Sequence, residues 1–163
     1  SLISMRESLN TTKEYRGYQE VLKNTKEALE VEGSTVEKEY EKAILEYSKH
    51  IKMIEPILEN YIINYLIQNV YPFSIHNIDA DISDYEESYR VLMVHLLTLK
   101  LMLIGNCYYY KDELQQEDII KVIYSNTKVT THNQGYLKGI IYELKNDGVY
   151  SLAWMIAIFK TLK

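Results

Sequence analysis

Carboxamide side chains recur at helical spacing in ILENYIINYLIQNVYPF, residues 57–73. Asn60, Asn64 and Gln68 stand four residues apart, so in a helix they lie on one face. Side-chain amides donate and accept hydrogen bonds, which suits a groove that binds a substrate or a partner. We therefore take Asn60 and Asn64, with the neighbouring Tyr61, as candidate substrate- or cofactor-binding residues. A narrow stripe that faces solvent is the commoner origin of such a pattern.

Histidines at two other places could supply an imidazole that titrates near neutral pH. His132 and Asn133 stand where one predicted helix gives way to the next, and a helix cap explains Asn133 equally well. His95 shares a helix face with Leu92 and Leu99, which is typical of a histidine in the core. We keep His95, His132 and Asn133 as candidate binding residues and assign no catalytic residue.

The sequence does not indicate a metal site, a redox centre or a cofactor site within this chain. Glu46 and His50 are spaced like half of a metal site, but no second pair of ligands stands nearby, so we expect a surface charge pair and no metal. Cys107 is the only cysteine, which excludes an intrachain disulfide and a cysteine-rich cluster within this chain. Glycine-rich phosphate loops and dinucleotide fingerprints are absent from the sequence, so we expect no cofactor to be bound by this chain alone.

Composition favours one globular domain spanning residues 1–163, either complete or a piece of a longer chain. A net charge of -5 argues against non-specific binding to nucleic acid or to an anionic membrane. The apolar run from Val91 to Ile104 is shorter than the ~20 residues that span a bilayer. The single cysteine fits a reducing, cytoplasmic location. Glu37, Glu39 and Glu41 alternate with lysines, which predicts a solvated face.

Two prolines and six glycines leave few points at which helices can be interrupted. The sequence predicts an all-α, single-domain bundle of about six to seven helices with a long central helix. Residues 73–82 lack helical periodicity and are predicted to form a loop. The predicted helices, with approximate bounds, are Leu2–Val31, Ser34–Ile54, Pro56–Tyr71, Asp84–Tyr109, Gln115–Thr130, Asn133–Gly148 and Val149–Leu162.

Two of these helices are expected to form the core. The helix starting at Pro56 is apolar on nearly every side, which is normally the mark of a buried central helix. We expect it to lie beside the long helix of residues 84–109, with Tyr61, Tyr65 and Leu96 buried. Pro56 fits the first turn of a helix, although it could instead kink a continuous one. Ser34 followed by Glu37 has the form of a capping box.

Four segments in order, ENYIINYLIQNVYPF, DYEESYRVLMVHLL, THNQGYL and LAWMIAIFK, resemble the helical C-terminal part of the flagellin lysine-N-methylase family. The resemblance covers the chain from Ile57 onward. It implies a bacterial protein lysine N-methyltransferase that acts on flagellin with S-adenosylmethionine, and a cysteine-rich iron–sulfur or metal cluster in the preceding part of a full-length relative. This chain departs from that pattern because it has only Cys107.

The resemblance therefore implies an accessory helical domain that shapes a substrate or cofactor groove and is not active alone. Two other functions fit the same residues. The chain could be a small-molecule-binding or dimerisation domain of a transcription regulator, with tyrosine hydroxyls and the asparagine stripe lining a cavity. It could also be a structural interaction module whose apolar last helix forms a partner interface. The sequence leaves the oligomeric state open.

Overall fold

The computed structural model describes residues 16–68, 85–132 and 134–161, and within these ranges every regular element is a helix. This confirms the all-α prediction. The described elements are α1 (Arg16–Leu29), α2 (Val36–Lys49), α3 (Ile51–Gln68), α4 (Tyr85–Tyr110), the 3-10 helix η3 (Lys111–Glu113), α5 (Gln116–His132), α6 (Gln134–Asn146) and α7 (Leu152–Thr161).

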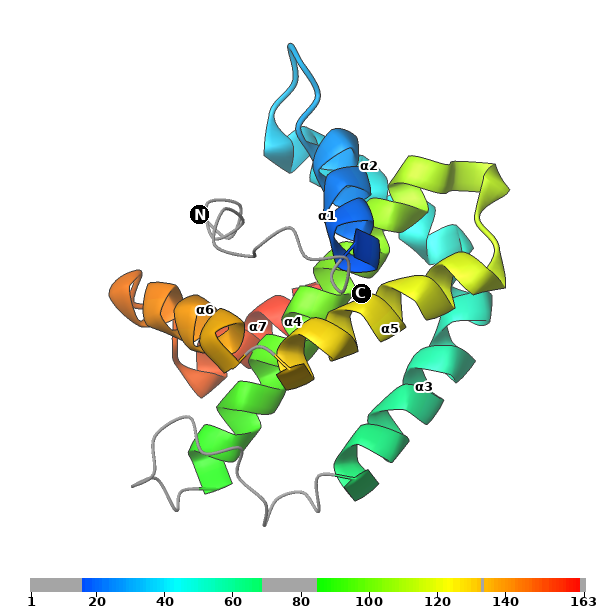
Figure 1. The fold of residues 1–163 in the computed structure, drawn as a ribbon. Helices are drawn as coiled ribbons and strands as arrows, with labels where there is room; N and C mark the ends of the chain where they lie inside the picture. The colour runs from blue at the N-terminus through cyan, green and yellow to red at the C-terminus, as the bar shows by residue number, and fades with distance from the viewer. Residues whose placement is uncertain (1–15, 69–84, 133, 162–163) are drawn as a thin grey trace.

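Helix α4 forms the centre of the fold, as predicted for the longest helix. It packs against α1, α2, α5, α6 and α7, and Figure 1 shows it running through the middle of the molecule. Its length and composition would allow it to cross a membrane, but 83% of its apolar window is buried, as in a core helix. Helix α7 packs on α4, so the apolar C-terminal segment docks against the central helix.

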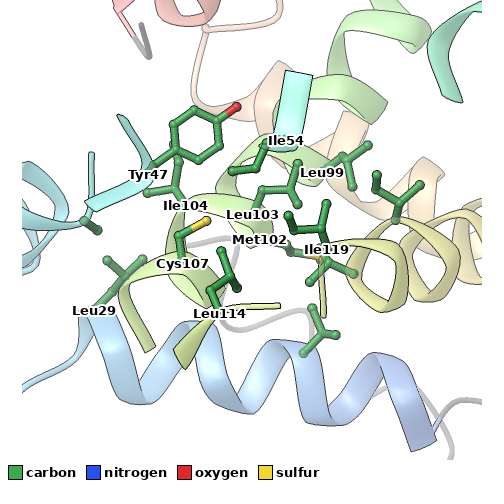
Figure 2. Close-up of a cluster of buried hydrophobic side chains, with 14 of the residues drawn as sticks. Leu29, Tyr47, Ile54, Leu99, Met102, Leu103, Ile104, Cys107, Leu114 and Ile119 are labelled. Carbon is green, nitrogen blue, oxygen red and sulfur yellow. The ribbon is translucent and has the colours of Figure 1, made fainter. Parts of the chain in front are cut away.

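Two hydrophobic clusters surround α4. In the larger one, Leu103 and Ile104 of α4 meet residues of four other helices, including Leu29 of α1, Tyr47 of α2 and Ile119 of α5 (Figure 2). The smaller cluster joins the first half of α4 to α6 and α7. Its buried members are Val91, Met93, Val94, Leu137, Ile140, Ile141 and Met155.

Helix α3 lies at the edge of the bundle, so the prediction of a second central helix is wrong. Ile54 is its only buried residue, and most of its backbone-level packing is against α5 and α2. Helices on several sides are needed to bury a helix that is apolar all round, and α4 already occupies the position where the others converge. Tyr61, Tyr65 and Leu96 are half-buried rather than fully buried.

The boundary between α2 and α3 also differs from the prediction. Helix α2 ends at Lys49, His50 interrupts the helical backbone with φ -95° and ψ 2°, and α3 begins at Ile51. The amide of Ile54 already donates to the carbonyl of His50 at 3.1 Å, so the helix is established before Pro56. Pro56 therefore lies inside α3, where its missing N–H removes one helical hydrogen bond.

The start of α2 is capped one residue later than predicted. Thr35 is the cap, and its hydroxyl accepts a hydrogen bond from the backbone N–H of Lys38 at 3.4 Å. The Ser34 hydroxyl instead donates to Oε1 of Glu39 at 2.7 Å. The predicted capping box of Ser34 with Glu37 is therefore wrong, because Ser34 pairs with the carboxylate of Glu39, two residues further into the helix.

Other boundaries agree within a few residues. Helix α5 continues to His132 and α6 ends at Asn146, followed by Gly148 with φ +70°, a conformation that favours glycine. The predicted loop of residues 73–82, the first part of the Leu2–Val31 helix and the predicted cap at Asn133 lie outside the described residues.

Candidate functional site

Three helices meet at a buried imidazole. His95 of α4 is 2% exposed, and its Nε2 lies 2.5 Å from the hydroxyl of Tyr61 on α3. The ring of Tyr65, one turn further along α3, stacks on the imidazole with centroids 5.0 Å apart and 17° between the planes. The Tyr61 hydroxyl also lies 3.0 Å from Oγ1 of Thr127 on α5. Tyr61 and His95, two candidates named separately, are therefore in contact.

The protons of the three hydrogen-bonding side chains in this cluster can be arranged in two ways. Oγ1 of Thr127 lies 2.7 Å from the carbonyl of Ile123, which can only accept. If the Thr127 proton points to that carbonyl, Tyr61 donates to Thr127 and Nε2–H of His95 donates to Tyr61. If it points to Tyr61, the phenol donates to an unprotonated Nε2. Burial raises the pKa of Tyr61 to about 12, so the phenol keeps its proton at neutral pH.

The asparagine stripe faces solvent. Asn60, Asn64 and Gln68 are exposed, together with two isoleucines of the same helix, Ile63 at 47% and Ile67 at 69%. The solvent-facing alternative is thus the one that the structure shows, and the stripe does not line an internal cavity of this chain. A binding role for Asn60 and Asn64 stays a prediction, now restricted to a surface contact.

The remaining candidates, His132 and Asn133, stand at the junction between α5 and α6. His132 is the last residue of α5, but its side chain and all of Asn133 lie outside the described residues. Their proposed binding role stays a prediction.

Glu39 is an important residue that sequence reasoning placed wrongly. Its side chain was expected on a solvated face, but Glu39 is 3% exposed. Its carboxylate accepts hydrogen bonds from Lys42 at 2.7 Å, Ser34 at 2.7 Å and Tyr108 of α4 at 2.9 Å. These three bonds, that of Lys42 first, lower its pKa to about 2. The sequence held one indication that Glu39 is buried: it stands four residues before the buried Ala43, on the same face of the helix.

Oε1 of Glu46 and Nε2 of His50 lie 3.3 Å apart, a contact that becomes an ion pair only when the imidazole is protonated, and Glu46 is buried rather than on the surface. Its other carboxylate oxygen accepts from Lys49 at 2.7 Å, which lowers the pKa of Glu46. The described residues contain no group of three or more His, Cys, Asp or Glu side chains that could hold a metal ion. Burial raises the pKa of Cys107 to about 12, so its thiol stays protonated and is a poor nucleophile.

A second polar network, not predicted from the sequence, joins α1 to α4. Nδ2 of Asn106 lies 3.1 Å from both the Val21 carbonyl and the Thr25 hydroxyl, while its Oδ1 accepts from Asn24 at 3.2 Å. The helices approach closely here, because a Cβ on Gly105 would lie 2.6 Å from the methyl group of Thr25. Both networks hold helices in place, so the described geometry is that of a scaffold with an outward-facing surface.

Comparison with known proteins supplies the family. Residues 1–158 match the family model described as the FliB lysine N-methylase C-terminal domain. Comparison with curated proteins and with solved structures gave no match. The match agrees with the resemblance seen from Ile57 onward and extends it across the first helices. The chain therefore belongs to the FliB lysine N-methylase C-terminal domain family.

Proposed function

We propose that this chain serves a flagellin lysine methylase as a substrate-contacting helical domain and does not itself carry out methyl transfer. The single observation behind the proposal is the family match over residues 1–158. The family name implies a protein substrate, and a protein substrate needs an outer contact surface. We propose the outer face of α3, Asn60, Ile63, Asn64, Ile67 and Gln68, as that surface.

The composition of this face supports a protein contact. No charged residue occurs from Asn60 to Gln68, in a chain of which 25% is charged. Centres of protein interfaces are depleted in charge and combine apolar contacts with hydrogen bonds. The exposed isoleucines supply the first component and the three carboxamides supply the second. The face is thus suited to a folded protein substrate rather than to an anionic ligand.

The residues of this chain do not fit the cofactors that the resemblance implies. An iron–sulfur cluster needs several thiolates, and Cys107 is alone, buried and protonated. A Rossmann-type site for S-adenosylmethionine needs a glycine turn between a strand and a helix, and the described residues form no strand. We therefore propose that S-adenosylmethionine and any cluster are bound outside this chain.

Purified flagellin can test the proposed surface directly. Titration of the chain into flagellin, followed by calorimetry, should give a binding isotherm that Ile67→Lys weakens about tenfold, because a charge is buried in an apolar contact. Leu45→Lys is the matched control, since Leu45 on α2 is 68% exposed and Ile67 is 69% exposed. The control should bind like the wild-type chain.

Two results would contradict the proposal. If flagellin gave no heat of binding and no change in sedimentation coefficient when mixed with the chain, the proposed substrate contact would be ruled out. Equal weakening by Ile67→Lys and Leu45→Lys would move the contact away from α3. A separate titration with S-adenosylmethionine should give no heat, and saturable binding to this chain would overturn the placement of the cofactor elsewhere.

A further inference from the structure

The two halves of α3 are attached to the bundle differently. The first half packs its apolar side chains against the larger hydrophobic cluster, through Ile54 and the partly buried Ile51, Met53, Ile57 and Leu58. Tyr61 is the last residue of α3 to join that cluster. Beyond it, Ile63 and Ile67 are exposed, and α3 adds nothing to either cluster that the described residues form.

Contacts to His95 distinguish the second half of α3. Tyr61 reaches Nε2 of His95 and Oγ1 of Thr127 through its hydroxyl. Tyr65 stacks its ring on the imidazole. Both tyrosines are only half-buried, whereas the imidazole beneath them is 2% exposed. Two aromatic rings from one short helical segment therefore shield a histidine that belongs to the central helix.

We propose that residues Tyr61–Gln68, here named the α3 cover, open and close over His95 while the rest of the bundle stays folded. Segments open locally when few buried apolar contacts hold them, and the free energy of such opening lies far below that of global unfolding. The α3 cover meets this condition, whereas α4 beneath it is packed by five other helices.

Opening of the α3 cover changes what a binding partner can reach. In the closed state His95 is shielded by Tyr61 and Tyr65. In the open state its imidazole, which can donate or accept a hydrogen bond, becomes accessible from the surface. The cover thus controls access to His95, and this inference does not depend on which protein contacts the outer face of α3.

Hydrogen exchange with mass spectrometry tests the opening in the intact chain. Amides of residues 62–68 should exchange about a hundredfold faster than those of residues 99–103 in α4, because they exchange through local opening. Tyr61→Phe keeps the ring but removes the hydroxyl contacts, so it should accelerate exchange of residues 62–68 by about a further tenfold. Tyr124→Phe makes the same chemical change at a 66% exposed tyrosine of α5 and should have no effect.

Labelling of imidazoles with diethylpyrocarbonate gives an independent readout. His95 should react slowly in the wild-type chain and about tenfold faster in Tyr61→Phe, since the reagent reaches it only through the open state. His50, at the junction of α2 and α3, makes none of the contacts in the cover and should react equally in both. Circular dichroism establishes that each variant keeps its helices.

Several outcomes would overturn the proposal. Equal protection of residues 62–68 and 99–103 would show that α3 opens only when the whole bundle unfolds. Absence of protection in residues 62–68 of the wild-type chain would show that the cover is not closed in solution. Labelling of His95 at the same rate in the wild type and in Tyr61→Phe would show that Tyr61 does not hold the cover.

Discussion

Helices α3 and α4 have similar apolar sequences but opposite places in the fold. Helix α4 buries polar side chains, including His95, Thr98 and Asn106, while α3 exposes Ile63 and Ile67. Each of the three polar side chains has a hydrogen-bond partner within the bundle. The number of packing partners therefore decides which of the two helices is buried, and a central helix tolerates polar side chains when they are hydrogen-bonded.

Truncating one large side chain on each helix should expose this difference most strongly. Leu103→Ala on α4 removes a side chain that is 1% exposed and should lower the free energy of unfolding by about 3 kcal/mol, because it leaves a cavity. Ile63→Ala on α3 should change that free energy by less than about 0.5 kcal/mol. Urea denaturation followed by circular dichroism measures both. Equal losses would mean that α3 is as deeply packed in solution as α4.

The close approach of α4 to α1 should give the next largest effect. Gly105→Ala places a Cβ 2.9 Å from the Thr25 backbone, so the helices must separate. A small-to-large change of this kind costs about 3 kcal/mol, and the better helix propensity of alanine offsets about 1 kcal/mol. The net loss in the free energy of unfolding should therefore be about 2 kcal/mol, measured by urea denaturation.

Thr25→Ser provides the control for this clash. It removes the Thr25 methyl group, which lies nearest to the added Cβ at 2.6 Å, but keeps the hydroxyl that Asn106 contacts. The double variant should recover part of the stability lost in Gly105→Ala. A double variant no more stable than Gly105→Ala alone would mean that the strain arises elsewhere.

The sequence predicted the helical elements well because their signals are local. The long central helix was expected over Asp84–Tyr109 and is found over Tyr85–Tyr110. The helix expected over Gln115–Thr130 is found over Gln116–His132. Periodic apolar residues and acidic residues in the first turn reflect interactions within a few residues of one another, so they can be read from the chain directly.

The position of α3 and the contacts of the candidate site could not be predicted in the same way. Two apolar helices compete for the same packing partners, and this competition decides which one lies at the centre. No local sequence pattern shows its outcome. Tyr61 and His95 were each identified, but their contact joins residues 34 positions apart. Glu39 and Tyr108 are 69 positions apart. Alternating glutamates and lysines suggest a solvated face unless the partner on the distant helix is known.

The Glu39 carboxylate, which ties α2 to α4, should make stability depend on acid. Its pKa is about 2 in the folded chain against an ordinary value of 4.5. The carboxylate therefore stabilises the fold above pH 4.5, and this contribution is lost as the pH falls toward 2. The wild-type chain should be more stable than Glu39→Gln at pH 6. The difference should be smaller than the effects of Leu103→Ala and Gly105→Ala, and it should shrink as the pH falls. Thermal unfolding at a series of pH values measures it.

Glu37→Gln is the control for the acid dependence, because Glu37 is exposed on the same helix. Its stability should follow that of the wild-type chain throughout. If Glu39→Gln and wild type differed equally at pH 6 and near pH 2, the difference would come from packing of the side chain rather than from its charge.

The smallest expected effect separates local from global stability in α3. Asn64 is exposed in the helix interior, so Asn64→Ala should favour the helical state of that segment by about 0.5 kcal/mol through propensity alone. If the α3 cover has already opened at the urea concentration that unfolds the rest of the bundle, this gain should slow hydrogen exchange in residues 62–68 without urea about twofold and leave the urea midpoint of the bundle unchanged. Lys138→Ala, an exposed change on α6, should not alter exchange in α3. A shift of the midpoint by the full propensity gain would instead show that the α3 cover stays closed until the bundle unfolds, which would place it in the same cooperative unit as α4.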